Sequence, residues 1–182
     1  MKKKSALVVI DMQNWSINED TKKIPGKIAD FINKNMSKFD FVLFTSARNT
    51  KESNLYKYLG IRGGLGGKQT EMRTEIKRFL TKDNLFTKTT YSAFKSKKFL
   101  DFLKRNRIRI LYLCGINTDK CVLATAYEAF DLGYDIRIIE DLIGSTTRTR
   151  AKHQGALRVL KGLVPKDKQY TSSTFSTDLN KA

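Results

Sequence analysis

The chain has very few of the residues that hold metals or form disulfide frameworks. Its 182 residues include one histidine and two cysteines. Two cysteines do not make a disulfide framework, and neither Cys114 nor Cys121 belongs to a Cys-x-x-Cys pair. A single histidine nearly excludes a zinc site built from histidine and cysteine. The simpler expectation is a reducing compartment, in which both thiols stay unpaired.

Long apolar runs and linker-like segments are also missing. No run approaches the roughly 20 apolar residues that span a bilayer. The N-terminal MKKKSALVVID begins like a signal peptide, but ALVVI is shorter than an h-region of about 7–15 residues and Asp11 ends it. With two prolines, no repeat and no low-complexity tract, residues 1–182 are expected to form one domain. We expect a soluble cytoplasmic protein that does not associate with membranes.

Acidic residues are scarce relative to basic ones. The chain has 35 Lys+Arg against 18 Asp+Glu, a formal net charge of +17. Such a surplus attracts nucleic acid or steers anionic substrates, and it also keeps a protein soluble. The basic residues are scattered along the chain and no interleaved aromatic–basic patch accompanies them. Nucleic-acid binding is therefore possible but not favoured.

Apolar runs of strand type alternate with stretches of helical period. Strands are expected at 6–11, 41–47, 84–94 (leading into a loop), 108–116 and 134–141, and helices at 27–36, 71–80, 96–107, 119–133 and 148–162. This alternation predicts a three-layer α/β domain with a mostly parallel, Rossmann-like sheet of about six strands. Ligands bind beyond the carboxyl ends of such strands, where Asp11, Lys88 and Cys121 stand.

Cys121 follows the strand at 108–116 and the turn INT. Thr118 is a plausible N-cap, which places Cys121 in the first helical turn, where free N–H groups and the helix dipole favour an anion. A thiol in that position is expected to have a lowered pKa, and the same N–H groups stabilise an oxyanion. Position alone still leaves a structural cysteine as the commoner outcome, and Cys114 indicates a core residue.

Three blocks of the sequence carry a family resemblance. ALVVIDMQNW, TKTTYSAF and LYLCGINTDKCVLATAYEAFDLGYDIRIIED resemble, in order and content, the isochorismatase-like cysteine hydrolases. This superfamily includes nicotinamidases, N-carbamoylsarcosine amidases and ureidoacrylate or biuret hydrolases. The resemblance runs from about residue 5 to about 162 and is weakest between 48 and 75. It implies the isochorismatase-like hydrolase fold and a homo-oligomer, either a dimer or a tetramer.

The resemblance also implies roles for individual residues. The family's catalytic carboxylate falls on Asp11, its lysine on Lys88 and its nucleophile on Cys121. A cis peptide before Asn117 is implied, which aims the backbone N–H groups of Asn117 and Cys121 at the substrate carbonyl oxygen. Asp11 would accept the thiol proton, Lys88 would stabilise the thiolate, and Cys121 would form a thioester.

The reaction implied is cleavage of a C–N bond in a small amide, ureido or carbamoyl compound. Nicotinamidases of the family bind a metal through an Asp and two His residues after the second strand, where this chain reads FTSARNTKESNLYKYL without histidine. We therefore expect no metal and no cofactor, and His153 is given no catalytic role. Two alternatives stay open: an isochorismatase-type vinyl-ether hydrolase, and a basic protein that binds nucleic acid or an acidic partner.

Several side chains near the motifs are candidates for a small-molecule pocket. Trp15, Tyr91 and Phe94 follow the motif residues and either wall the pocket or pack beneath it. Arg48 follows the second strand and would grip a substrate carboxylate if it points inward. Thr118, the plausible N-cap, is a further candidate for the pocket.

Overall fold

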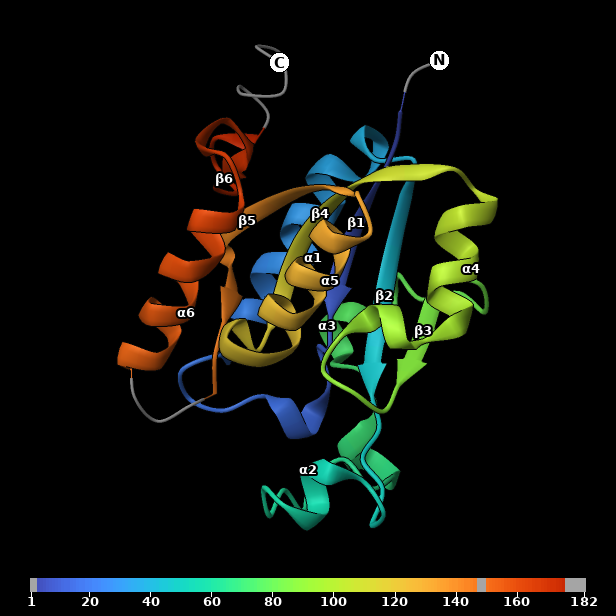
Figure 1. The fold of residues 1–182 in the computed structure, drawn as a ribbon, viewed down its shortest axis with the longest axis vertical. Coiled ribbons are helices and arrows are strands. Elements are labelled where there is room, and N and C mark those ends of the chain that lie inside the picture. Colours follow the sequence, from blue (N-terminus) through green and yellow to red (C-terminus); the bar gives the residue numbers. More distant parts are fainter. Residues whose placement is uncertain (1–2, 147–149, 176–182) are drawn as a thin grey trace.

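The protein is described by a computed structural model that covers residues 3–146 and 150–175. Six parallel strands form one sheet in the order β3-β2-β1-β4-β5-β6 (Figure 1). Their bounds are β1 Lys4–Ile10, β2 Phe41–Ala47, β3 Leu85–Lys88, β4 Ile108–Ile116, β5 Asp135–Gly144 and β6 Gln169–Tyr170. Helices cover both faces, which confirms the predicted three-layer α/β fold with about six strands.

Alternate residues of the central strand belong to two separate cores. Ala6, Val8 and Ile10 of β1 face one core and Leu7 and Val9 face the other, as expected for a strand buried on both sides. The first core is closed by helices α4 (Lys97–Arg105), α5 (Leu123–Asp131) and α6 (Arg150–Leu163), and the second by α1 (Ile24–Asn35) and α3 (Thr74–Lys77).

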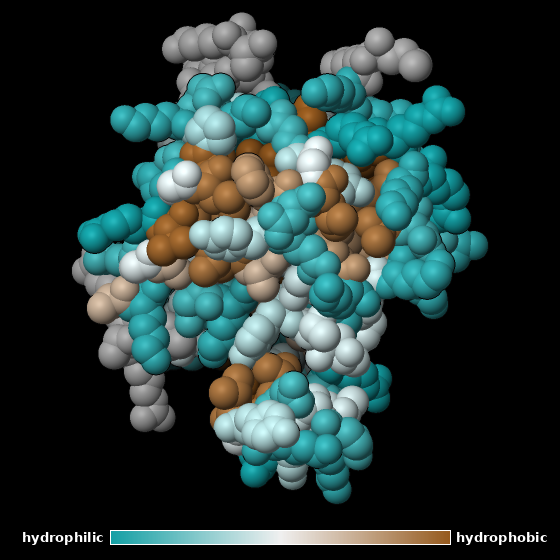
Figure 2. Space-filling view, in the orientation of Figure 1, coloured by the Kyte–Doolittle hydropathy of each residue, from teal (hydrophilic) through white to brown (hydrophobic). Residues whose placement is uncertain are grey.

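The face that α5 covers is not uniformly polar. Figure 2 shows hydrophobic side chains gathered over its centre and hydrophilic side chains around them. Tyr127 and Phe130 of α5 are among the exposed apolar residues. Across residues 3–146 and 150–175, no helix is both long enough and apolar enough to cross a membrane.

Four elements differ from the prediction. The helix expected at 71–80 is reduced to the single turn α3, because Phe79 N–H and Leu80 N–H bond three residues back and end it in tight turns. The helix expected at 119–133 begins as a π-helical turn, Thr118–Val122, before α5. The strand expected at 134–141 extends to Gly144, and the two-residue β6 was not predicted.

The strand order reverses beside β1. The chain first runs outward from β1 to β2 and β3, and then returns to place β4 on the opposite side of β1. This is the switch point at which open α/β sheets bind ligands, beyond the carboxyl ends of the strands. Asp11 follows β1 and the turn bearing Cys121 follows β4, so the switch point places both side chains together. A small lobe that contains α2 (Asn54–Lys57) stands beyond the same ends of the strands (Figure 1).

Gly115 permits the close approach of β4 to β1 at this switch point. Its φ of +114° lies in the region that favours glycine, and a Cβ here would come within 2.2 Å of the Ile10 carbonyl oxygen and 2.6 Å of the Ile10 nitrogen. Both contacts are with backbone, so no side chain can move aside to relieve them. The register of the two strands that carry the site therefore depends on this glycine.

We predict that Gly115→Ala lowers the free energy of unfolding by about 3 kcal/mol or more, because backbone strain and a backbone clash add at one position. Urea denaturation followed by far-UV circular dichroism measures the change. Gly155→Ala is the matched control: it lies in α6 with nothing within 4 Å of the new methyl group, and should raise stability by about 0.4–1 kcal/mol. Equal midpoints for wild type and Gly115→Ala would contradict the prediction.

Candidate active site

Asp11 is held in a backbone conformation that few non-glycine residues adopt. Its φ is +53°, and it is 2% exposed. The backbone N–H of Asp11 donates to the Thr45 carbonyl oxygen at 3.2 Å, and the Asp11 carbonyl oxygen accepts from the Ser16 hydroxyl at 2.7 Å. The Thr45 hydroxyl also donates to Oδ1 of Asp11 at 2.7 Å. These bonds to β2 and to the following turn fix the carboxylate at the end of β1.

Lys88 ends β3 and points its ammonium group at Asp11. Its Nζ lies 2.7 Å from Oδ2 of Asp11, 2.9 Å from the Thr90 carbonyl oxygen and 3.3 Å from Sγ of Cys121. All three protons of the ammonium group therefore have partners. Burial acts to lower the pKa of Lys88, but the Asp11 carboxylate, with a contribution from the Cys121 sulfur, more than offsets this effect and raises the pKa. The lysine is thus a buried cation at neutral pH.

Cys121 sits in the irregular turn that follows β4. The Ile116–Asn117 peptide bond is cis, as the resemblance implies. In the π-helical turn, the Asn117 carbonyl oxygen accepts from the N–H groups of Lys120 and Val122, both at 3.1 Å, and the N–H of Cys121 between them makes no bond to that oxygen. The predicted N-cap at Thr118 is wrong: Asn117 is the cap residue, without a side-chain bond. The predicted oxyanion hole at Asn117 and Cys121 stays a prediction.

The resting thiol differs from the expectation of a lowered pKa. Burial and the neighbouring Asp11 carboxylate raise the pKa of Cys121 to about 12, and Lys88 acts in the opposite direction without overcoming them. The Cys121 sulfur is buried in the turn. The cost of burying a thiolate therefore outweighs the stabilisation that the helix start and Lys88 would give it. At neutral pH the sulfur therefore carries its proton, next to a carboxylate that can take it.

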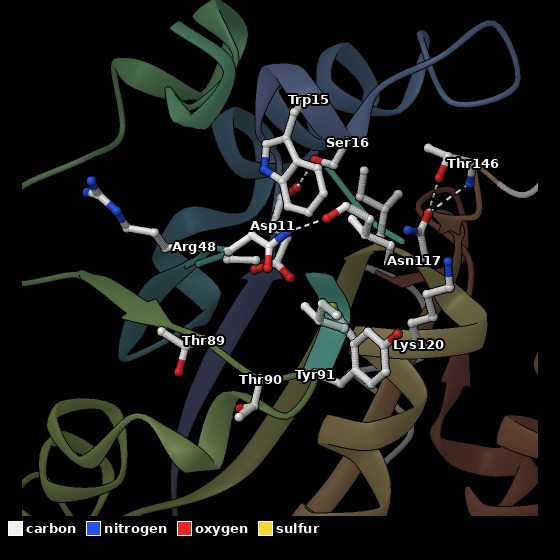
Figure 3. A pocket seen from close by; sticks show the side chains of 16 residues that line it. Asp11, Trp15, Ser16, Arg48, Thr89, Thr90, Tyr91, Asn117, Lys120 and Thr146 are labelled. Carbon is white, nitrogen blue, oxygen red and sulfur yellow. Dashed lines mark hydrogen bonds between the residues drawn. The ribbon is translucent and has the colours of Figure 1, made fainter. Parts of the chain in front are cut away.

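A cavity of about 200 Å³ opens beside these three residues (Figure 3). It lies at the carboxyl ends of the strands, and side chains of the 48–75 segment form part of its wall. The residues that line it are Asp11, Trp15, Ser16, Ala47, Arg48, Asn49, Leu55, Ile61, Thr89, Thr90, Tyr91, Ile116, Asn117, Lys120, Cys121 and Thr146. A carboxylate and a thiol thus reach a common space that has room for a small molecule.

The predicted pocket residues divide into two groups. Trp15, Arg48 and Tyr91 line the cavity, although Figure 3 shows the Arg48 guanidinium directed away from Asp11. Phe94 and Thr118 do not line it, which corrects both expectations. Phe94 belongs to the core, with its ring 5.4 Å from that of Phe99 and 5.3 Å from that of Tyr134.

Thr118 points away from the cavity towards α6. Its side chain is fully buried, and its hydroxyl lies 2.9 Å from Nδ1 of His153. The only histidine of the chain thus contacts the turn that carries Cys121 without lining the cavity. This position agrees with the view of His153 as a packing residue, since it bonds to the first residue of the π-helical turn.

Sequence reasoning missed several residues of the site. Thr45 had a detectable signal, because its hydroxyl comes directly after the apolar stretch FVLF in β2. Asn49 is buried and donates to the carbonyl oxygens of Ile61 at 2.8 Å and Gly63 at 3.1 Å, which ties the variable segment to the end of β2. Lys120 stands directly before the nucleophile candidate and also lines the cavity.

A metal was not expected at this site. Among the residues that the structure describes, no three His, Cys, Asp or Glu side chains gather in a way that could hold a metal ion. The prediction of a metal-independent site stays a prediction.

Comparison with known proteins gives one family. The isochorismatase domain matches residues 5–174. The uncharacterized isochorismatase family protein YwoC of Bacillus subtilis is 29% identical over 167 residues, which cover 86% of this chain and 85% of that protein. Isochorismatase domain-containing protein 2 of Xenopus laevis is 30% identical over 63 residues, so this match spans 35% of the chain and less than a third, 31%, of that relative.

Solved structures share the same fold. An isochorismatase-like hydrolase from Alkaliphilus metalliredigens superposes with a TM-score of 0.80 at 20% identity, covering 97% of this chain and 96% of that one. N-carbamoylsarcosine amidase from Thermoplasma acidophilum superposes with a TM-score of 0.76 at 23% identity, covering 93% of this chain and 96% of that one. Nicotinamidase PncA from Bacillus subtilis superposes with a TM-score of 0.75 at 25% identity, covering 87% of this chain and 94% of that one.

We predict that Asp11→Asn makes Cys121 more reactive towards iodoacetamide. Removing the carboxylate removes a charge that raises the thiol pKa and leaves Lys88 with the sulfur as its counter-charge, so the thiolate fraction rises. The rate at pH 8 should increase about tenfold for each unit by which the thiol pKa falls. Peptide mass spectrometry assigns the label, and fully buried Cys114 should stay unlabelled while the protein is folded.

Asp119→Asn is the control for this experiment, because it makes the same change near the thiol at a carboxylate bonded to Ser145. Its labelling rate should equal that of the wild type. An Asp11→Asn protein that is folded by circular dichroism but labels no faster than wild type would contradict the assigned electrostatics.

Proposed function

The chain belongs to the isochorismatase family of hydrolases, and we propose that it is a metal-independent cysteine hydrolase that cleaves a C–N bond in a small molecule. The observation that carries this proposal is the buried contact of Asp11, Lys88 and Cys121 at the wall of one cavity. A nucleophile, a proton acceptor and a fixed cation are the groups that acyl transfer through a thiol requires.

In the proposed first step, the substrate carbonyl carbon lies above Sγ of Cys121. As the C–S bond forms, Asp11 accepts the thiol proton, so that no free thiolate is needed beforehand. Lys88 remains a cation and stabilises both the carboxylate before transfer and the sulfur during attack. The carbonyl oxygen becomes an oxyanion that accepts hydrogen bonds from the backbone N–H groups of Asn117 and Cys121.

The tetrahedral intermediate then breaks its C–N bond. Asp11 returns the proton to the departing nitrogen, which leaves as ammonia or an amine, and the acyl group stays on Cys121 as a thioester. A water molecule gives its proton to Asp11 and attacks the thioester carbonyl carbon. The C–S bond breaks, the acid product leaves, and the sulfur regains a proton from Asp11.

The raised thiol pKa supports this sequence of steps. A sulfur that holds its proton until a carbonyl carbon arrives is less exposed to alkylation and oxidation than a permanent thiolate. The cost is that Asp11 must take the proton at the moment of attack, and Lys88, 2.7 Å from Oδ2 of Asp11, holds that carboxylate in place. Lys88 therefore acts first, by holding the Asp11 carboxylate, and Asp11 acts next, by taking the thiol proton.

The size of the cavity and the names of two structural neighbours support amide-type substrates. A volume of about 200 Å³ lies below the roughly 300–1,000 Å³ of sites for drug-sized ligands, so the substrate is a compact molecule. The neighbours named N-carbamoylsarcosine amidase and nicotinamidase point to carbamoyl and amide C–N bonds. The segment after β2 has no histidine, which makes nicotinamide itself the less fitting substrate.

We predict that ammonia release from a panel of small amides, ureido acids and carbamoyl compounds identifies at least one substrate, and that Cys121→Ala lowers its kcat/KM by about 10³-fold or more. Cys114→Ala, at the other thiol, should keep kcat/KM within a few-fold of wild type, because Cys114 lies inside β4 and does not line the cavity. A coupled ammonia assay measures both.

Mass spectrometry of the quenched reaction should show an acyl adduct on the peptide that contains Cys121. Undiminished turnover in Cys121→Ala would overturn the nucleophile assignment. If vinyl-ether cleavage were detected and survived this substitution while no amide reacted, the isochorismatase-type alternative would replace the proposal.

A further inference from the structure

One wall of the cavity carries three hydrogen-bond donors that the proposed reaction does not use. Lys120, Asn117 and Tyr91 line this wall, and Figure 3 shows the Lys120 side chain between the Tyr91 ring and the Asn117 amide. Lys120 and Asn117 belong to the same turn as Cys121, so the wall is covalently tied to the nucleophile.

The Asn117 amide is oriented by its neighbour. Its Oδ1 accepts from the backbone N–H of Thr146 at 2.7 Å and from the Thr146 hydroxyl at 3.0 Å. The Nδ2 group therefore points away from Thr146, and it donates to no other group in the part of the chain that the structure describes. An amide fixed through its oxygen presents two N–H donors to the cavity.

Lys120 and Tyr91 add a cation and a hydroxyl. Over residues 3–146 and 150–175, no carboxylate lies within salt-bridge distance of the Lys120 ammonium group, and the Tyr91 hydroxyl bonds to no other residue. Asp119, the acid beside them in sequence, is occupied by the Ser145 hydroxyl at 2.7 Å. Burial, with Cys121 and Asp119, raises the pKa of Tyr91, so its hydroxyl keeps its proton and can donate it.

The rest of the cavity lining offers these donors no counter-charge. Asp11 is its only acidic residue, and that carboxylate is already paired with Lys88 at 2.7 Å. Arg48, at the other end of the lining in Figure 3, adds a second cation. A neutral amide substrate would need neither Lys120 nor Arg48. A half-buried cation without an anion is costly to keep in a small cavity.

We infer that Lys120, Asn117 and Tyr91 form a subsite for a carboxylate group of the substrate. The substrate class is then an acid that carries its amide, ureido or carbamoyl group within a few bonds of that carboxylate. A carboxylate accepts up to four hydrogen bonds and suits a charged donor flanked by neutral ones. The inference rests on the proposed function for its chemistry, but the binding of an anion at this wall can be tested without turnover.

The test compares two alkylating reagents of similar size, 3-bromopropionate and 3-bromopropionamide. In both, the Cys121 thiol gives its proton to Asp11 or to the buffer, and its sulfur forms a C–S bond as the C–Br bond breaks and bromide leaves. Only the first reagent carries a carboxylate. We expect the acid-to-amide rate ratio at Cys121 to exceed the ratio for N-acetylcysteine. Lys120→Gln should lower that ratio about tenfold or more, because the acid reagent loses a charged hydrogen bond that the amide reagent does not make.

Three further variants separate this subsite from the general field of a +17 protein. Lys98→Gln removes one exposed charge from α4 and should keep the wild-type ratio. Lys120→Arg should restore most of the preference. A ratio that falls in Arg48→Gln but not in Lys120→Gln would place the anion at the other end of the cavity and overturn the inference.

The outcome is independent of catalysis. A wild-type protein that prefers the acid reagent through Lys120 supports the subsite even if no amide in the panel is hydrolysed, in which case only the proposed function fails. A protein that releases ammonia from amides but shows no Lys120-dependent preference for the acid reagent keeps the proposed function and overturns the subsite.

Discussion

The buried pair of Lys88 and Asp11 is the interaction on which the site depends. Removing two charges from water costs several kcal/mol for each ion, and their attraction offsets this only when the remaining donors and acceptors are also satisfied. Here they are: the ammonium protons reach Asp11, the Thr90 carbonyl oxygen and Cys121, and Oδ1 of Asp11 accepts from Thr45. The pair joins the ends of β1 and β3 across β2 to the turn after β4. A change in any of these strand ends would therefore disturb the charges around the sulfur.

The fold was predictable because it depends on local patterns, whereas the roles of Asp11, Lys88 and Cys121 came from the family resemblance and stay predictions. The runs ALVVI, FVLFTSA and IRILYLCGI are apolar on both faces, which indicates buried parallel strands, and the polar residue that ends a strand of this kind lies at the ligand-binding edge. The single domain, the homo-oligomer and the cellular location depend on properties that strand patterns do not encode, and they stay predictions. The shortness of α3 was not predictable, because the helical pattern at 71–80 does not show that the N–H groups of Phe79 and Leu80 bond three residues back.

The protonation state of Cys121 was not predictable, because it depends on the balance of burial against charge. The helix start and the lysine were visible in the sequence, and both favour a thiolate. The depth of the sulfur was not visible, since it is set by the turn after β4 and by the loop at residues 89–91, which packs over it. Phe94 and Thr118 failed as pocket residues for a related reason: sequence distance from a motif does not say on which side of the backbone a side chain points.

The same buried pair bears on the substrate class that we propose for the cavity. An unpaired Asp11 carboxylate would repel an acid that approached the neighbouring sulfur, and at close range in a partly desolvated site that repulsion is not well screened. Lys88 neutralises Asp11 and does not itself line the cavity, where Lys120 and Arg48 are the cations among the lining residues. In the proposed reaction, the cation that stabilises the carboxylate and the attacking sulfur would thereby also allow an anionic substrate to approach the nucleophile. The proposal thus links catalysis and substrate choice through Lys88, which does not line the cavity.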